Sequence, residues 1–231
     1  NYVTLAKAAA LVRSVLGEES LQQHSYVHAH GTSTPKNRVT ESHVLNEVAK
    51  AFDIQDWPVA AIKCYVGHSQ GTAAGDQTIS ALGTWAHGMI PGIATTEQVA
   101  DDVHQSNLLF SQQDIDLSER RMDTALINAK GFGGNNATGV IFSPEVTLKM
   151  LAKKHGPEAI SAWEDKVQVQ KERAAQYLTD ADAGRFELVY HFGDQPVLEG
   201  PELQISAHEV RIPGYDRAVS LDLDNPFSDM S

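Results

Sequence analysis

The sequence predicts an α/β layered domain followed by a small extension of helix and strand. Up to Pro144, short β-rich runs alternate with segments of helical spacing, an order typical of layered α/β domains. From residue 145 the chain becomes heavily charged before further β-rich runs appear. We therefore expect a core at residues 1–144, a helical and β extension at 145–212, and an acidic tail at 213–231.

The first part of the core predicts helix, strand and helix in turn. Residues 3–16 have helical spacing and stop at Gly17, and the β-rich run 26–30 predicts a short strand. Residues 40–52 predict an amphipathic helix. Its apolar face consists of Val44, Leu45, Val48, Ala49 and Phe52.

The second part of the core begins with a predicted buried strand at 59–65 and a helix rich in small residues at 69–87. Two further strands, 124–128 and 138–142, flank a glycine turn at 131–134. Beyond the core, residues 145–181 predict helix interrupted at Gly156-Pro157. The remaining β-rich runs, expected to form a small meander, are 186–192, 202–206 and 208–212.

Composition excludes several classes of protein. The formal net charge is −12, which argues against a general nucleic-acid binder. No apolar run approaches the ~20 residues that a membrane span requires. The single cysteine, Cys64, excludes an internal disulfide and suits a reducing compartment such as the cytoplasm. The chain begins with Asn rather than Met, so we expect a piece of a longer protein.

Three glycine-containing motifs are the candidate functional segments. They are His30-Gly31-Thr32-Ser33-Thr34, the segment from Lys63 to Gly75, and Gly131-Phe132-Gly133-Gly134-Asn135-Asn136-Ala137. The first two place a histidine beside glycine where a strand is expected to end, which is a favourable place for a site. His28 and His30 could share a strand face and bind metal, but no third ligand has a suggestive spacing, so we expect no metal.

A serine hydrolase is one alternative reading of the second motif. Gly67-His68-Ser69-Gln70-Gly71 matches G-x-S-x-G, the nucleophile elbow, with Ser69 as the nucleophile. Lys63 in the strand before this elbow would be a costly buried ammonium unless it were paired. The acid and base that a triad needs after the serine have candidates in Asp114, Asp123, His155 and His191.

The three motifs together resemble the C-terminal half of the β-ketoacyl synthase family, over roughly residues 3–144. Lys63 and His68 have the family's spacing, and Glu41 stands eleven residues after His30. The resemblance implies half of a thiolase-like layered α/β/α sandwich. It also implies the decarboxylative Claisen condensation of malonyl-acyl carrier protein with an acyl thioester in fatty-acid synthesis.

The resemblance assigns a role to each candidate residue. His30 and His68 would stabilise the enolate with neutral Nε2–H donors, while Glu41 and Lys63 would pair and hold the two histidines. The further candidates are Phe132 as gate and oxyanion donor, Gly131 and Gly133 beside it, and Thr32 and Thr34 as ligands of the pantetheine arm.

The nucleophilic cysteine of the family is absent from these motifs. Cys64 lies in the predicted strand beside Lys63, which is not the family's setting for a nucleophile. We therefore expect the cysteine in a missing N-terminal half and expect the fragment alone to be inactive. The resemblance further implies a homodimer, acyl carrier protein as partner, and acyl-CoA or malonyl thioesters as substrates, with no cofactor.

Two departures from the family pattern fit a long bacterial class that starts fatty-acid synthesis. Asn37-Arg38 stands where many synthases have Gly-Asp, and Lys130 stands where many have an aromatic residue. A non-catalytic, ketosynthase-like partner subunit is the other alternative. Retention of His30, His68 and Lys63 argues against that alternative.

Overall fold

The structure is a computed structural model that describes residues 1–185 and 200–225. The chain divides into two compact units, Asn1–Asp165 and Lys166–Ser231, which are described separately. Among the helices in the described residues, none is both long and apolar enough to cross a membrane.

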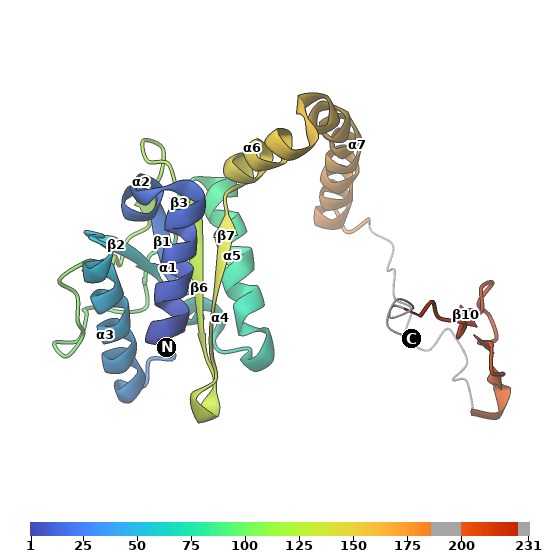
Figure 1. Cartoon of the computed structure of the whole chain (residues 1–231), viewed down its shortest axis with the longest axis horizontal. Helices are drawn as coiled ribbons and strands as arrows, with labels where there is room; N and C mark the ends of the chain where they lie inside the picture. Colours follow the sequence, from blue (N-terminus) through green and yellow to red (C-terminus); the bar gives the residue numbers. More distant parts are fainter. Residues whose placement is uncertain (186–199, 226–231) are drawn as a thin grey trace. The chain divides into compact units, whose positions relative to one another are not determined.

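The first unit is built on a five-stranded sheet in the order β4-β2-β1-β6-β7 (Figure 1). All neighbouring pairs are parallel except β6 and β7, which form an antiparallel hairpin. The central strand β1 is buried along its whole length, as is typical of a parallel sheet covered on both faces. The strands are β1 (Ser25–His28), β2 (Trp57–Ala60), β4 (Leu108–Leu109), β6 (Thr124–Lys130) and β7 (Asn136–Phe142).

Helices cover both faces of this sheet and make three layers. Alternate residues of each strand point to opposite faces, so Val27 and Leu126 join one apolar cluster while Tyr26 and Ile127 join the other. The first cluster is completed by α1 (Tyr2–Leu16) and α3 (Pro35–Ala51), and the second by α5 (Ala73–His87). This is the predicted layered α/β/α architecture.

Short elements complete the first unit. A second, two-stranded antiparallel sheet pairs β3 with β5, and neither strand was expected from the sequence. The short elements are α2 (Glu18–Gln23), α4 (Lys63–Val66), the 3₁₀ helices Gln70–Thr72 and Phe132–Gly134, β3 (Met89–Ile90) and β5 (Ile115–Asp116).

The predicted strand at 59–65 is wrong after Ala60. The strand β2 ends at Ala60, and the next residues turn into α4, which carries Lys63 and Cys64. A short continuous apolar run does not distinguish a strand from a buried helix. The neighbouring limits also move, since β1 ends at His28 rather than His30 and α3 begins at Pro35, with proline in its first turn.

Two helices follow the sheet, as expected. They are α6 (Pro144–His155) and α7 (Pro157–Asp182). Ser143 caps α6 by accepting a hydrogen bond from the Val146 N–H. Gly156, with φ of 88°, ends the helix before Pro157. The predicted domain boundary at residue 144 stays a prediction.

The second unit contains a three-stranded antiparallel sheet in the order β10-β9-β8. Its strands are β8 (Gln204–Ile205), β9 (Glu209–Arg211) and β10 (Val219–Ser220). The strand β10 lies inside the segment expected to be an acidic tail, so that expectation is wrong at this point: Val219 and Ser220 pair with β9. The strand expected at 186–192 lies outside the described residues.

Candidate active site

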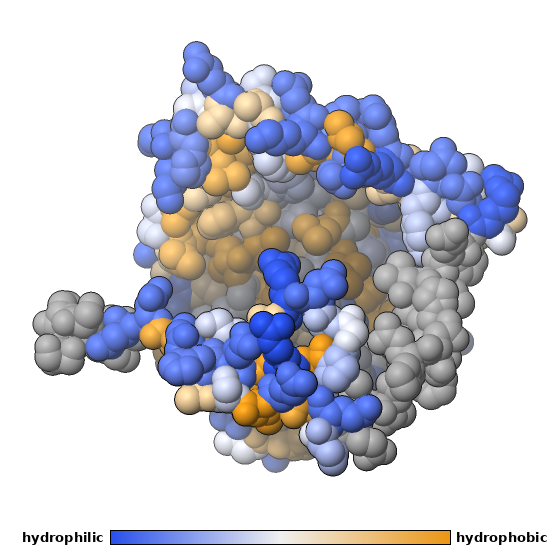
Figure 2. Space-filling model, turned by 90° about the vertical axis from the view of Figure 1, so that its right-hand side faces the viewer, coloured by the Kyte–Doolittle hydropathy of each residue, from blue (hydrophilic) through white to orange (hydrophobic). Residues whose placement is uncertain are grey.

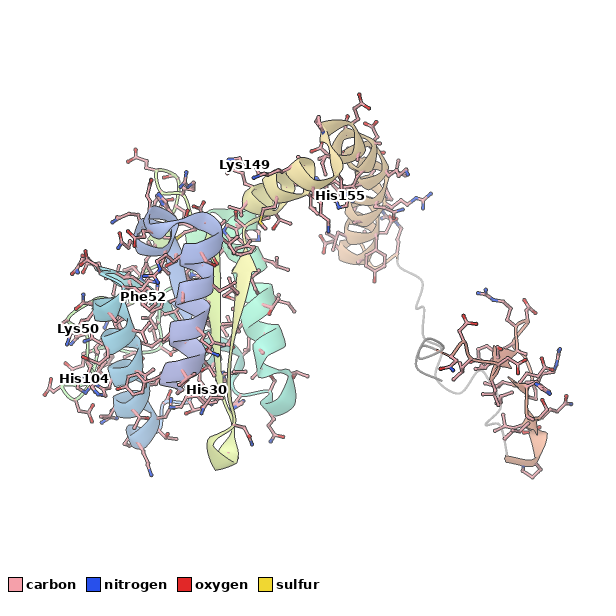
Figure 3. All side chains as sticks on the ribbon, in the orientation of Figure 1. His30, Lys50, Phe52, His104, Lys149 and His155 are labelled. Carbon is pink, nitrogen blue, oxygen red and sulfur yellow. The ribbon has the colours of Figure 1, made fainter. Side chains whose placement is uncertain are left out.

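The first two motifs meet at the carboxyl ends of the parallel strands, where open α/β sheets bind ligands. His30 follows β1 by two residues, and His68 lies in the loop between α4 and α5. Figure 3 shows His30 at the same end of the sheet as the β6–β7 turn. The two imidazole rings face each other edge to face, with centroids 5.3 Å apart and planes at 82°.

Each imidazole is held by a backbone N–H. The Lys130 N–H donates to Nδ1 of His30 over 3.3 Å. The Gln70 N–H donates to Nδ1 of His68 over 3.0 Å. A neutral ring whose Nδ1 accepts a hydrogen bond carries its proton on Nε2. This geometry favours the Nε2–H tautomer in both rings.

The charge of His30 is set by its surroundings. Burial lowers its pKa, and Lys63 lowers it further, while Glu41 opposes the shift. His68 and Lys130 also lower the pKa of His30. A depressed pKa keeps the imidazole neutral at neutral pH, so that it can donate from Nε2 without carrying a charge.

The carboxylate of Glu41 accepts hydrogen bonds from four groups around His30. Glu41 lies on α3, is 3% exposed, and accepts from the backbone N–H of His30 over 2.7 Å and of Gly31 over 3.0 Å. Its carboxylate also accepts from Asn37 over 2.9 Å and from Asn128 over 2.6 Å. The four donors compensate for the burial of this carboxylate and fix the backbone that carries His30.

Two buried amide side chains complete the support, and sequence reasoning missed both. Gln77 on α5 donates from Nε2 to the carbonyl oxygen of Ala29 over 2.7 Å and to that of Asn128 over 3.2 Å. Asn128 on β6 accepts from Thr138 over 3.3 Å. A polar residue at a position of full burial was the signal available, because such residues need partners.

Lys63 does not pair with Glu41 as expected. Among the residues that the structure describes, no ion pair or hydrogen bond joins the two side chains, and the buried Nζ of Lys63 has no hydrogen-bond partner. Burial lowers the pKa of Lys63, while the charges of Glu41 and Asp76 oppose the shift. Lys63 therefore interacts with Glu41 and His30 electrostatically, without a hydrogen bond to either in the described part of the chain.

The third motif forms the turn between β6 and β7. Gly131 donates its N–H to the Asn135 carbonyl oxygen over 2.6 Å, and Asn135 donates from Nδ2 to the Phe132 carbonyl oxygen. Gly133 has φ of 78°, in the left-handed region that favours glycine. The Phe132 side chain is fully exposed. Its roles as gate and oxyanion donor stay predictions.

The two threonines lie between β1 and α3. Thr32 is half-buried, and Thr34 is exposed and immediately precedes α3. Thr34 caps the helix by position only, because its side chain makes no capping hydrogen bond. Both hydroxyls border the histidine motif, and their contact with a pantetheine arm stays a prediction.

The hydrolase reading of the second motif fails on geometry. The elbow requires a strand before the serine, but α4 precedes Ser69. The Ser69 hydroxyl donates to the carboxylate of Asp76, and Nδ1 of the adjacent His68 is occupied by Gln70. Of the candidate acids, Asp123 already accepts from Ser20 and pairs with Arg121, and Asp114 accepts from the Gly92 N–H.

Cys64 has no setting that would activate it. The residue lies on α4 and lines a cavity of about 360 Å³ with Val59, Phe110 and Ile93 among other residues. Burial raises the pKa of its thiol. A nucleophilic cysteine needs a lowered pKa, so this thiol is protonated and unreactive at neutral pH.

Several apolar side chains on and beside α4 and α5 are exposed among the described residues of the first unit. Val66, Ile79, Leu82 and Met89 are all exposed there, and three of them line a hollow of about 370 Å³. Figure 2 views the chain from the right-hand side of Figure 1 and shows apolar residues among its paler, more distant atoms. An exposed apolar patch of this kind marks an interaction surface.

Comparison with known proteins agrees with this geometry. Residues 3–97 match the family described as the C-terminal domain of β-ketoacyl synthases. The β-ketoacyl-[acyl-carrier-protein] synthase FabY of Pseudomonas aeruginosa is 46% identical over 230 residues, which are 100% of this chain and 36% of FabY. The 3-oxoacyl-[acyl-carrier-protein] synthase 1 of Escherichia coli K12 is 33% identical over 116 residues, which are 50% of this chain and 27% of that enzyme.

Solved structures give the same fold. The crystal structure of FabY from P. aeruginosa has a TM-score of 0.82 and 45% identity, covering 100% of this chain and 36% of that chain. A ketosynthase of the bacillaene polyketide synthase of Bacillus amyloliquefaciens shares the fold alone, with a TM-score of 0.50 and 20% identity over 61% of this chain and 26% of that chain. This chain thus spans about 36% of the length of FabY. Its residues 3–97 carry the C-terminal domain of the β-ketoacyl synthase family.

Proposed function

We propose that this chain supplies the two histidines of a β-ketoacyl-[acyl-carrier-protein] synthase that works in cytoplasmic fatty-acid synthesis. The observation that carries the proposal is the facing pair His30 and His68, each held at Nδ1 by a backbone N–H. Two neutral Nε2–H donors directed at one thioester oxygen stabilise the negative charge that develops there during decarboxylation.

In the proposed reaction, the malonyl thioester loses CO₂ and the electron pair of the broken C–C bond moves into an enolate. His30 and His68 stabilise the enolate oxygen. The enolate carbon then attacks the acyl thioester on a cysteine that lies outside this chain, and the tetrahedral oxyanion collapses to release the thiolate. The Phe132 N–H donates to that second oxyanion, together with the N–H of the cysteine.

The proposed partners follow from the same reaction. Malonyl and acyl groups arrive on acyl carrier protein or coenzyme A, and Thr32 and Thr34 contact the pantetheine arm at the edge of the histidine motif. The remainder of the same enzyme, which supplies the cysteine, covers the apolar side of α4 and α5. The complete enzyme is a homodimer.

The experiment uses the full-length enzyme that contains this chain and measures CO₂ release from malonyl-acyl carrier protein. Replacing either histidine, in His30→Ala or His68→Ala, should lower the rate about 100-fold, the loss typical of removing one oxyanion donor. The matched control is His104→Ala, which removes an exposed histidine from the loop between β3 and β4 and should keep the wild-type rate.

A second control separates the hydrolase alternative. Ser69→Ala should leave condensation almost unchanged, whereas it would abolish a reaction that used Ser69 as nucleophile. The proposal is wrong if either histidine variant retains the wild-type rate of decarboxylation, or if Ser69→Ala removes the activity.

A further inference from the structure

Lys130 makes two different contacts around His30, one from its backbone and one from its side chain. Its N–H donates to Nδ1 of His30 over 3.3 Å. Its ammonium donates to Oδ1 of Asn37 over 2.8 Å and to the Thr40 hydroxyl over 3.3 Å. The last residue of β6 is thereby joined both to the imidazole and to the first turns of α3.

Asn37 and Glu41 close these contacts into a ring. Asn37 accepts from Lys130 through Oδ1 and donates from Nδ2 to Glu41 over 2.9 Å. Glu41 in turn accepts from the backbone N–H of His30 over 2.7 Å. The ring therefore runs from His30 through Lys130, Asn37 and Glu41 back to His30, and it connects β1, β6 and α3.

We propose that Lys130 is a positioning residue for the reaction: its side chain, anchored on Asn37, holds the end of β6 so that the Lys130 N–H keeps His30 as an Nε2–H donor. The inference rests on the proposed function, and it assigns the role to a residue outside the three motifs. The same anchor holds the start of the turn that carries Phe132, because Lys130 directly precedes that turn.

The ammonium of Lys130 has a second effect that gives the role a separate readout. Four charged or titratable groups face His30 from the elements around it: Glu41, Lys63, His68 and Lys130. Three of them lower the pKa of His30 and only Glu41 raises it. Removing the Lys130 charge therefore raises the pKa of His30, so the loss of activity on acidification begins at higher pH.

The experiment measures decarboxylation of malonyl-acyl carrier protein by the full-length enzyme as a function of pH. Lys130→Met removes the anchor and the charge, and we expect kcat to fall about tenfold because the donor is misplaced. We also expect the acidic limb of the pH–rate profile to move to higher pH by about half a unit. Lys130→Arg keeps the charge and should leave the acidic limb in place. The control is Lys149→Met, which removes a solvent-exposed lysine paired with Glu145.

A second measurement keeps the two proposals distinguishable. Histidine-ring ¹⁵N NMR of the same proteins reports the tautomer of His30, identified by its loss in His30→Gln. Wild type should show the Nε2–H form alone, and Lys130→Met a mixture of tautomers. If Lys130→Met fails to fold, Asn37→Leu breaks the same ring at the next bond and should lower kcat in the same way.

The outcomes separate as follows. An active wild type whose Lys130→Met variant keeps the wild-type kcat, acidic limb and tautomer overturns the role of Lys130 alone. A wild type without decarboxylase activity overturns the proposed function, and the His30 tautomer in Lys130→Met then decides whether the positioning role survives.

Discussion

The surroundings of His30 and His68 differ sharply, although the two rings face each other. His30 is buried just beyond the end of β1, where its backbone N–H donates to Glu41 and its imidazole accepts from the Lys130 N–H. His68 lies in an exposed loop, and among the described residues its imidazole accepts a hydrogen bond from Gln70, two residues away. His30 is thus held by residues distant in sequence, whereas His68 is held by a residue of its own loop.

The contrast between the two histidines shows which part of the candidate site this chain forms by itself. Around His30, the buried side chains of Glu41 on α3, Gln77 on α5 and Asn128 on β6 all have hydrogen-bond partners. The segment that carries His68 is exposed from Tyr65 to Thr72, and among the described residues the buried ammonium of Lys63 on α4 has no hydrogen-bond partner. We infer that the remainder of the enzyme, which carries the cysteine in the proposed function, completes the His68 side on assembly.

The change with the largest expected effect removes the acceptor on the His30 side. Glu41→Ala leaves the backbone N–H groups of His30 and Gly31 and the amides of Asn37 and Asn128 without their acceptor. It should lower the free energy of unfolding by about 4 kcal/mol, since each unsatisfied buried donor costs about 1–3 kcal/mol. Urea-induced unfolding measures the change.

The matched control for that substitution lies on the same helix. Glu47 on α3 pairs with Lys50 at the surface, and exposed pairs of this kind contribute little. Glu47→Ala should therefore change the free energy of unfolding by less than about 0.5 kcal/mol. Equal losses in Glu41→Ala and Glu47→Ala would contradict the organising role of Glu41.

A smaller effect is expected from acidification, and it comes from His28. This residue is 0% exposed, and burial with the nearby charge of Lys63 lowers its pKa to about 4. Between the unfolded value of about 6.5 and the folded value, the unfolded chain binds more protons, so stability falls as pH falls through this window. The loss should reach about 3 kcal/mol.

His28→Asn removes the titrating group and serves as the comparison. The difference between wild type and His28→Asn in the free energy of unfolding should change with pH inside that window and stay constant above it. A wild type whose pH dependence is the same as that of His28→Asn would show that the buried imidazole is not kept neutral by its surroundings.

The sequence predicted the elements that have a clear hydrophobic periodicity. It missed the short elements whose conformation depends on tertiary contacts. The helix at 3–16 and the strands beside the glycine turn were correct because their patterns are long and regular. The strands β4 and β5 have two residues each, too few for a pattern. The run at 59–65 was assigned to strand throughout because hydrophobicity alone does not separate β2 from α4.

The candidate site divides in the same way. The motifs identified His30, His68 and Glu41 because glycine, histidine and spacing are visible in the sequence. The support from Asn128 and the Lys130–Asn37 contact was not visible, because these partners are about 90 residues apart. The expected Glu41–Lys63 pair failed because Glu41 is already surrounded by N–H donors, a feature that only the fold creates.

Hydrogen exchange followed by mass spectrometry, on the 231-residue chain and on the full-length enzyme, tests the central claim most directly. We predict that the amides of His30 and Gly31, which donate to Glu41, are protected in both proteins. Amides of residues 64–72, which lie in an exposed segment of the chain alone, should become more protected in the full-length enzyme. Equal protection of residues 64–72 in both proteins, or an unprotected His30 in the chain alone, would contradict the account.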